Sequence, residues 1–594
     1  MRVFRRALVL VIFAVFTANA SAQDGRWWPS QAVPKGLVRT IEQNTFPAPA
    51  IVHEMLVQSV AGLAAKSVND GRGDELVWVA TTNVELEHWY TLQTKRRPEL
   101  EIRGTLEPWE LVDRYVRKGI IKGYILYAAD QSHRPNFEHA TRMNQSVNVA
   151  TSLAGLLDGV LIDESLQKQA EAHGLKLLID ARNLSPTDCF AKYKDRFNRR
   201  LLFAQDPKKS NSRDLAITHQ AFTLNGDDRL MSEVMAWLEP LSPILGWNGG
   251  DEFKTTRRSS VHGHFQTATD WCMNLPVLMA GSESVEPGKV SHVDPRTLDW
   301  NDNRSAVSFV LSDGDNVQWS ESSFFLSNQD FWNSPDRGKI PFGWSCCFSH
   351  LTQLAPVIID HALATRTGKD EFLEWGGGYY YPDLFGKSRP DRWDLLARHA
   401  AGTWALMRRN DTRIIGFNVW RPDSRDARKS YEVFAGETDG LLAIFVFQYS
   451  PYEGGAGKTY WVKDRRGIEI PVITARYSIW EHTNGRPRSG TPTRVAREIR
   501  ESVTAAGKEP QYDWCIAHAW SYFRRAAGND EEAEEMPQEN AAEQGGQRGF
   551  SPITWCAERL PKEIRVVGPE ELVWRIRMNH NATQTKQILQ EMRP

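Results

Sequence analysis

The sequence predicts an α/β protein in two parts: an N-terminal α/β region with parallel sheets, residues 23–290, and a C-terminal (β/α)8-like barrel, residues 291–594. In both parts, apolar segments of strand length alternate with amphipathic segments of helix length, as in βαβ units. Eight strand segments follow residue 305. Eight strands with helices over about 290 residues fit the size of a (β/α)8 barrel. A stretch rich in Ser, Pro, Gly and Asp, residues 281–303, separates the two parts.

The chain begins with the features of a secretory signal peptide. A basic head, residues 1–6, precedes an apolar run at 7–18 and the small residues Ala20-Ser21-Ala22. A helix of this apolar run spans about 18 Å, whereas a bilayer core is roughly 30 Å thick. We therefore expect residues 1–22 to be a cleaved signal peptide, with the mature chain starting at Gln23. No later run is apolar enough to cross a membrane, so we expect an exported protein, periplasmic or extracellular.

The composition excludes some partners. A formal net charge of -2 and a pI near 6.8 argue against a nucleic-acid-binding protein, which normally carries a basic excess. No nucleotide-binding glycine loop occurs in the N-terminal region, and we predict no cofactor. The 22 tryptophans favour a carbohydrate-binding cleft, although a large core also uses tryptophan.

The N-terminal region contains four strand candidates and four helices, which predict a mainly parallel sheet divided into two or three small units. The strands are 75–80, 122–127, 159–162 and 175–180, and the helices are 51–65, 108–118, 149–157 and one that begins at Glu164.

One segment near the end of this region has two interpretations. Residues 244–252 are an apolar strand followed by Trp247, two glycines and the acids Asp251 and Glu252. Parallel sheets commonly present ligand-binding groups at such a position. The alternative is an ordinary turn in which Asp251 caps a helix and Glu252 lies in its first turn. His262 and His264 follow without a third metal ligand, so we predict no metal site.

The barrel prediction depends on eight short apolar runs. They are 307–311, 341–345, 371–375, 413–418, 443–448, 472–477, 513–518 and 564–567. Amphipathic helices are expected at 356–364, 393–409, 491–505 and 570–578. Between 443 and 477 there is little room for a helix, so a distorted or incomplete barrel is an alternative. Residues 528–549 are acidic and polar, and we expect a disordered insertion there.

The segment Trp375–Asp383 combines three glycines, three tyrosines and a proline. Glycines permit unusual backbone angles and close approach, and tyrosines offer flat faces with hydroxyls at the rim. This segment is suited to form a wall against a sugar. The alternative is a glycine-rich turn with tyrosines packed beneath it.

The motif G-G-G-Y-Y-Y-P at 376–382 resembles the signature of the GxGYxYP family of glycoside hydrolases. Three further segments, 309–319, 447–454 and 475–480, are also similar to that family's pattern and occur in the same order. The resemblance implies a related fold and a carbohydrate-active enzyme that hydrolyses glycosidic bonds in an oligo- or polysaccharide.

In a barrel, ligand-binding groups follow the carboxyl ends of the strands. Aromatic and polar residues gather at these positions, which indicates a functional cleft. The predicted substrate-binding residues are Asn316, Gly376, Gly378, Tyr379, Tyr381, Asn418, Trp420, Tyr449, Tyr452, Arg476, Tyr477, Trp480 and His518.

Glycoside hydrolysis requires one protonated carboxyl and one ionised carboxyl. Asp313 and Asp315 follow the first barrel strand and can supply one of them, although Asp next to Gly is also common in turns. We predict Glu453, after the fifth strand, as the partner, with Asp383 and Glu481 as further candidates.

Two other functions are compatible with the sequence. A carbohydrate-binding protein without catalysis would keep the aromatic cleft and lack the acid pair. A metal-dependent, deacetylase-like hydrolase would use Asp313 or Asp315 with His350 or His518, but no compact His motif accompanies these acids.

Overall fold

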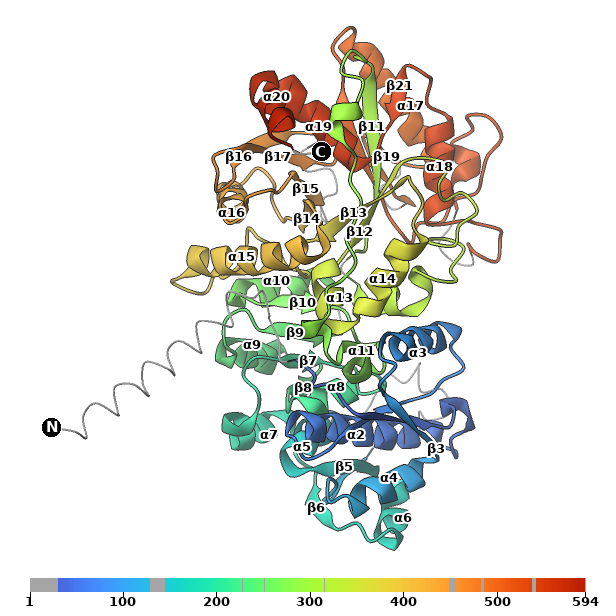
Figure 1. The fold of residues 1–594 in the computed structure, drawn as a ribbon, viewed down its shortest axis with the longest axis vertical. Helices are drawn as coiled ribbons and strands as arrows, with labels where there is room; N and C mark the ends of the chain where they lie inside the picture. Colours follow the sequence, from blue (N-terminus) through green and yellow to red (C-terminus); the bar gives the residue numbers. More distant parts are fainter. Residues whose placement is uncertain are drawn as a thin grey trace, which may run out of the picture.

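The structure is a computed structural model that describes residues 30–128, 145–226, 228–249, 252–314, 316–447, 456–481, 486–536 and 541–592. The molecule is elongated (Figure 1), with the N-terminal sheets at one end of the long axis and the larger C-terminal sheet at the other. The predicted signal peptide, residues 1–22, lies outside the described residues.

The N-terminal region contains three small sheets in which every strand pair is parallel, as predicted. Their strand orders are β2-β1-β3, β5-β4-β6 and β10-β9-β7-β8. The strands are β1 (Gly36–Thr40), β2 (Glu75–Trp78), β3 (Glu101–Leu106), β4 (Gly123–Tyr127), β5 (Gly159–Asp163), β6 (Leu177–Asp180), β7 (Leu202–Ala204), β8 (Phe222–Leu224), β9 (Pro243–Gly246) and β10 (Phe265–Thr267).

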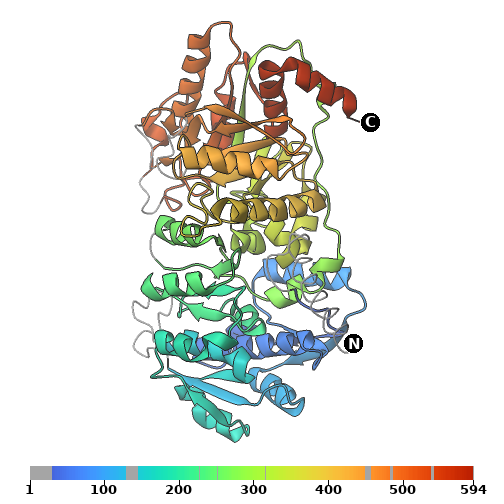
Figure 2. The ribbon, with the colours of Figure 1, turned by 90° about the vertical axis from the view of Figure 1, so that its left-hand side faces the viewer.

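The helices of this region cover the sheets in stacked layers, which Figure 2 shows from the side. They are α2 (Ala50–Asn69), α3 (Val84–Arg96), α4 (Pro108–Arg117), α5 (Ser146–Leu157), α6 (Gln167–Ala172), α7 (Pro186–Tyr193), α8 (Arg213–Thr218), α9 (Asp228–Trp237), α10 (Glu252–His262) and α11 (Leu275–Met279). Helix α2 is buried along most of its length and contacts both α8 and β5. Because α2 is apolar on most of its faces, it joins the layers that contain α8 and β5 into one core.

The C-terminal half is built on one curled sheet of eleven strands, in the order β16-β17-β15-β14-β13-β12-β11-β20-β18-β19, with β21 paired to β11. The strands are β11 (Ser305–Leu311), β12 (Phe342–Cys346), β13 (Asp370–Trp375), β14 (Ile414–Asn418), β15 (Ala443–Phe447), β16 (Thr459–Lys463), β17 (Glu469–Thr474), β18 (Tyr477–Ile479), β19 (Ser489–Gly490), β20 (Tyr512–Ala517) and β21 (Ile564–Val566).

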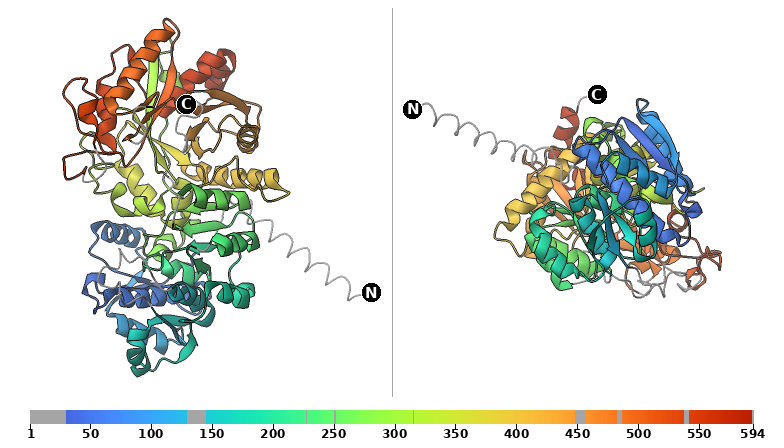
Figure 3. Two further views of the ribbon diagram at one scale, coloured as in Figure 1. Left: turned by 180° about the vertical axis from the view of Figure 1, so that it is seen from behind. Right: turned by 90° about the horizontal axis from the view of Figure 1, so that it is seen from below.

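Helices surround this sheet, as the view from behind in Figure 3 shows. They are α12 (Val317–Trp319), α13 (Phe348–Leu354), α14 (Pro356–Thr365), α15 (Arg392–Asn410), α16 (Arg425–Gly436), α17 (Pro492–Ala506), α18 (Phe550–Glu558), α19 (Pro569–His580) and α20 (Ala582–Glu591).

The structure does not confirm a closed (β/α)8 barrel, and the difference arises between β15 and β20. The strand expected at 472–477 is two strands, β17 and β18, and only Ala475 and Arg476 connect them. β17 pairs with β15 and β16, whereas β18 pairs with β19 and β20. The chain therefore passes from one part of the sheet to another without a helix. Trp514 of β20 donates a hydrogen bond of 3.2 Å to the carbonyl oxygen of Ile473 in β17, so the curled sheet is bridged by a side chain there.

The acidic segment at 528–549 differs from the expectation of disorder in its described residues. Glu534 is fully buried, forms an ion pair of 2.9 Å with Arg559 and accepts a hydrogen bond of 2.8 Å from the Thr493 backbone. A cation and a helix N-terminus are both favourable partners for this buried carboxylate. Among the described residues, no helix is long and apolar enough to cross a membrane.

Candidate active site

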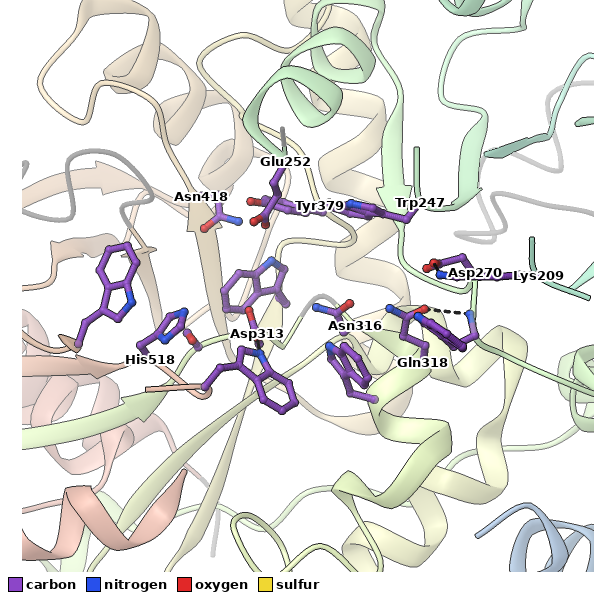
Figure 4. A pocket seen from close by; sticks show the side chains of 16 residues that line it. Lys209, Trp247, Glu252, Asp270, Asp313, Asn316, Gln318, Tyr379, Asn418 and His518 are labelled. Carbon is purple, nitrogen blue, oxygen red and sulfur yellow. Dashed lines mark hydrogen bonds and ion pairs between the residues drawn. The ribbon is translucent and has the colours of Figure 1, made fainter. Parts of the chain in front are cut away.

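A cavity of about 450 Å³ lies where the carboxyl ends of parallel strands from two sheets meet, one sheet from each half of the molecule. Open α/β sheets bind ligands at their carboxyl ends, and here two such edges share one space. Figure 4 shows the side chains around it. The cavity is lined by Lys209, Trp247, Glu252, Asp270, Trp271, Ser312, Asp313, Asn316, Gln318, Trp319, Trp375, Tyr379, Asn418, Trp480, His518 and Trp520.

The N-terminal region supplies five of these residues, because each follows a strand of the sheet β10-β9-β7-β8. Lys209 follows β7, Trp247 and Glu252 follow β9, and Asp270 and Trp271 follow β10. In the segment 244–252, Trp247 and Glu252 therefore line the cavity, and Glu252 also lies in the first turn of α10, as the alternative interpretation expected. Asp251 lies outside the described residues. The other three lining residues were not predicted, since isolated Lys, Asp and Trp residues in loops carry no pattern.

The C-terminal half supplies the remaining residues from at least five strand ends. Ser312 and Asp313 follow β11, Trp375 ends β13, and Asn418 ends β14. Trp480 follows β18, and His518 and Trp520 follow β20; all three line the cavity. Of the predicted substrate-binding residues, the structure brings together Asn316, Tyr379, Asn418, Trp480 and His518.

Asp313 lies at the floor of the cavity in a constrained backbone. Its φ is +67°, an uncommon conformation for a residue other than glycine. The next residue must be glycine, because a Cβ at Gly314 would lie 2.4 Å from the backbone carbonyl carbon of Ser345. The indole N–H of Trp520 donates a hydrogen bond to Oδ2 of Asp313. Backbone and side chain together hold this carboxyl in one orientation.

The electrostatic surroundings of Asp313 favour its protonated form. Burial raises the pKa of Asp313 to about 7, and the negative charge of Glu252 acts in the same direction. The carboxyl groups of Glu252 and Asp313 point into the same space from opposite sides (Figure 4), with Asn418 and Tyr379 beside Glu252. Glu252 is the first residue of α10, where the helix dipole stabilises a negative charge. Of the three carboxyl groups that line the cavity, Asp270 is paired with Lys209, and Glu252 and Asp313 have different environments.

Seven of the 16 residues that line the cavity are tryptophan or tyrosine. Six of the 22 tryptophans line it. Trp247 stacks on Tyr379 with ring centroids 5.9 Å apart and planes at 17°. Trp271 is 48% exposed, and the ammonium group of Lys209 lies 3.9 Å from its ring centroid. Flat apolar faces next to carboxyl, amide and ammonium groups are suited to a molecule with both apolar faces and hydroxyls.

The glycine–tyrosine segment joins the two halves. Gly376, Gly377 and Gly378 all have positive φ, at 59°, 73° and 114°. The backbone of the next residue, Tyr379, exchanges hydrogen bonds of 2.8 Å and 3.0 Å with Gln266 of β10. The three glycines thus allow the loop after β13 to add a short antiparallel bridge to the N-terminal sheet.

The tyrosines of this segment have different environments. Tyr379, Tyr380 and Tyr381 are all buried, and only Tyr379 is among the residues that line the cavity. The backbone N–H of Tyr381 bonds to the Ser260 hydroxyl at 2.9 Å. The centroid of the Tyr381 ring lies 5.4 Å from that of the Phe253 ring. Tyr379 therefore lies in the cavity wall, whereas Tyr381 is packed beneath the turn.

Several predicted site residues lie away from the cavity. Trp420 stacks on Phe253 with centroids 3.8 Å apart. Arg476 forms an ion pair of 3.4 Å with Asp513, and Tyr477 is buried at the amino end of β18. Because the predicted strand is divided here, Tyr477 begins β18 and Arg476 immediately precedes it, so neither residue ends a strand. Gly376 and Gly378 shape the loop through their backbone.

The remaining acid candidates divide into two groups. Asp383 is buried and accepts hydrogen bonds of 3.1 Å and 3.0 Å from the backbone N–H groups of Trp420 and Arg421, which gives it a structural role in the loop after β14. Glu481 is not among the cavity-lining residues. Asp315, Tyr449, Tyr452 and Glu453 lie outside the described residues.

The two histidines considered as metal ligands have other partners. His350 shares a hydrogen bond of 2.8 Å with the Thr267 hydroxyl, and burial lowers its pKa to about 3. His518 bonds to the Ser521 hydroxyl at 2.9 Å. In the described part of the chain, no three His, Cys, Asp or Glu side chains are grouped so as to hold a metal ion.

The difference between a buried tyrosine and an exposed tryptophan is testable. We expect Tyr381→Ala to lower the free energy of unfolding by about 3–5 kcal/mol, because it removes a fully buried aromatic side chain. Trp271→Ala should leave stability nearly unchanged and weaken oligosaccharide binding by about 0.5–1.5 kcal/mol. Chemical denaturation and calorimetric titration measure the two effects. Equal stability losses in both variants would contradict this assignment.

Comparison with known proteins agrees with this architecture. Three family models match the chain: "GxGYxYP putative glycoside hydrolase C-terminal domain" at residues 303–525, "GxGYxYP_N second domain" at 121–197 and "GxGYxYP third domain" at 199–280. A solved structure from Bacteroides thetaiotaomicron, described as a "putative hydrolase", is similar with a TM-score of 0.71 at 20% identity, over 93% of this chain and 96% of that one. No curated protein matches the sequence. Because the second-domain, third-domain and C-terminal models of the GxGYxYP family match successive segments of this chain, the chain belongs to that family.

Proposed function

We propose that the protein is an exported glycoside hydrolase that cleaves an oligo- or polysaccharide in the cavity between its two halves. The observation that supports this proposal best is the placement of Asp313, a carboxyl with a raised pKa, across a tryptophan-lined cavity from Glu252. Family membership supports the same reaction class.

Asp313 is suited to be the general acid. A pKa of about 7 keeps a substantial fraction of its carboxyl protonated at neutral pH. The Trp520 indole N–H occupies Oδ2, so Oδ1 is left to carry the proton. A proton on Oδ1 can pass to the glycosidic oxygen as the bond to the sugar ring breaks, and Asp313 is then the conjugate base.

Glu252 is suited to be the second carboxyl. As an ionised group it would act as nucleophile on the anomeric carbon or as base for an attacking water, depending on its separation from Asp313. Glu453 and Asp315, predicted from sequence, remain candidates for the same role. The tryptophan faces would hold neighbouring sugar rings by stacking, and Asn418 and His518 offer hydrogen-bonding groups to hydroxyls.

A glycan library tests this function. The mature protein, expected to begin near Gln23 by intact-mass measurement, should release reducing ends from at least one neutral glycan. Glu252→Gln should abolish that release if Glu252 is the partner of Asp313, and Glu453→Gln should do so if the sequence-based pairing is right. Binding of glycans without any release of reducing ends would identify a carbohydrate-binding protein and contradict the proposal.

A further inference from the structure

A second cavity, of about 370 Å³, lies at the opposite end of the C-terminal sheet from the proposed active site. Its lining includes residues that immediately precede strands: Arg413 before β14, Leu442 before β15 and Ile468 before β17. The active-site cavity is at the carboxyl ends of the same sheet. Helices α19 and α20, which close the second cavity, lie at the end of the molecule away from the N-terminal sheets (Figure 1).

Arg577 of α19 is the unusual residue in this cavity. Its side chain is buried, with a relative exposure of 5%, and no hydrogen bond or ion pair joins its guanidinium to the described residues. The centroid of the Trp574 ring lies 5.6 Å from the guanidinium carbon. This cation–π contact is weaker than a hydrogen bond to an anionic acceptor. Burial lowers the pKa of Arg577 to about 10, and the opposing charge of Asp464, which pairs with Arg466 at 3.2 Å, does not offset this loss of solvation. A buried guanidinium without an acceptor is costly and calls for an explanation.

The acids that line the cavity do not supply that acceptor, because each has another partner. Asp411 and Glu570 both bind His292, at 3.2 Å and 2.5 Å. Burial alone would lower the pKa of His292, but these two carboxylates raise it to about 9, so the histidine is charged at neutral pH. Asp439 accepts a hydrogen bond of 2.8 Å from the Trp404 indole.

Three further arginines line the cavity, and two of them, Arg413 and Arg466, form ion pairs with Asp411 and Asp464. Arg408 of α15 is exposed and has no ion pair within the described ranges. Apolar side chains also line the cavity, namely Leu441, Ile468, Ile588 and Met592. The lining thus combines a buried cation, an exposed cation and apolar side chains.

We propose that this cavity binds a small organic anion, with its carboxylate or phosphate on Arg577 and its apolar body against Leu441, Ile468 and Ile588. Arginine binds such oxyanions with paired, charge-assisted hydrogen bonds, which would satisfy the buried guanidinium. The cavity volume is within the range of small-molecule sites. The site is separate from the proposed active site, so its failure would leave the proposed function untouched.

Calorimetric titration with three probes tests the ligand class on the full mature protein. We expect 4-phenylbutyrate to bind at millimolar or lower concentration, and its uncharged amide and inorganic phosphate to bind at least ten-fold more weakly. Equal binding of the amide would show that Arg577 contributes nothing, and equal binding of phosphate would show that the apolar wall contributes nothing. Either result, or no binding of 4-phenylbutyrate, would overturn the proposal.

The variant Arg577→Met separates a ligand-binding role from a structural one. Without ligand, we expect this variant to unfold at a higher temperature than the wild type, because it replaces an unsatisfied buried charge by an apolar chain of similar length. It should bind 4-phenylbutyrate at least ten-fold more weakly. Arg398→Gln, which removes an exposed arginine from the same helix as Arg408, is the matched control and should bind normally. A less stable Arg577→Met protein with unchanged binding would refute the site.

Discussion

Asp313→Asn is expected to lower the turnover of the glycan substrate by about 100- to 10,000-fold, with little change in substrate affinity. The amide keeps the shape of the side chain and can still accept the Trp520 hydrogen bond, but it has no proton to transfer. Single-turnover kinetics and equilibrium titration of the same protein give the two quantities. Asp299→Asn, an exposed change outside the cavity, is the matched control and should behave as the wild type.

The pH dependence provides an independent readout of the same residue. The raised pKa keeps Asp313 protonated below about pH 7, so kcat should fall as the pH rises through this value. The residual activity of Asp313→Asn should lack this decrease of kcat, which is the basic limb of the pH profile. Trp520→Phe removes a donor that stabilises the ionised carboxyl, so the limb should move to higher pH. A limb that persists unchanged in Asp313→Asn would show that another group is the acid.

Gly378→Ala is expected to lower the free energy of unfolding by about 2–5 kcal/mol and to abolish catalysis in the remaining folded protein. The residue has a φ of +114°, which alanine adopts only with strain. Its new Cβ would lie 2.8 Å from Cδ2 of Phe265 and 2.9 Å from Cε1 of His350. Relief of these contacts must move the loop, and Tyr379 would lose its bridge to Gln266.

Gly436→Ala is the matched control for this substitution. Gly436 ends α16 and has no unusual φ, and a Cβ added there would have no atom within 4 Å. Denaturant unfolding should therefore show no loss in Gly436→Ala. If Gly378→Ala were as stable and as active as this control, the loop would not be the connection that positions the cavity wall.

The main strands of the C-terminal half follow closely from the sequence, whereas β16, β19 and five N-terminal strands, β1, β3, β7, β8 and β10, were not predicted. Seven of the eight predicted strands of the C-terminal half begin and end within two residues of β11, β12, β13, β14, β15, β20 and β21. Short apolar runs between amphipathic helices are a local signal, and buried parallel strands give that signal in full. The eighth prediction merged β17 and β18, because neither Gly nor Pro marks a break at residues 475–476 and the division depends on which neighbours each strand pairs with.

The candidate site was predictable only in part. Asp313 and Asn418 were found because they follow strands of one sheet, where the rule for parallel sheets applies within a single domain. Glu252 was recognised only as one of two interpretations of a strand end, and Lys209, Asp270 and Trp271 gave no signal. These residues belong to the cavity only because the N-terminal sheet β10-β9-β7-β8 meets the C-terminal sheet there. The two sheets are far apart in the sequence, so no local pattern indicates this contact.

Local sequence is sufficient to predict the main strands of the C-terminal half, the unusual backbone at 376–378 and the position of Asp313 after an apolar strand, because these depend on local sterics and on the periodicity of apolar residues. Contacts between distant segments, in contrast, specify which acid faces Asp313, which tyrosine reaches the cavity and that Arg577 is buried without an acceptor among the described residues. Each of these depends on two segments brought together by burial of apolar surface, which is non-directional and leaves no local pattern that names the partner.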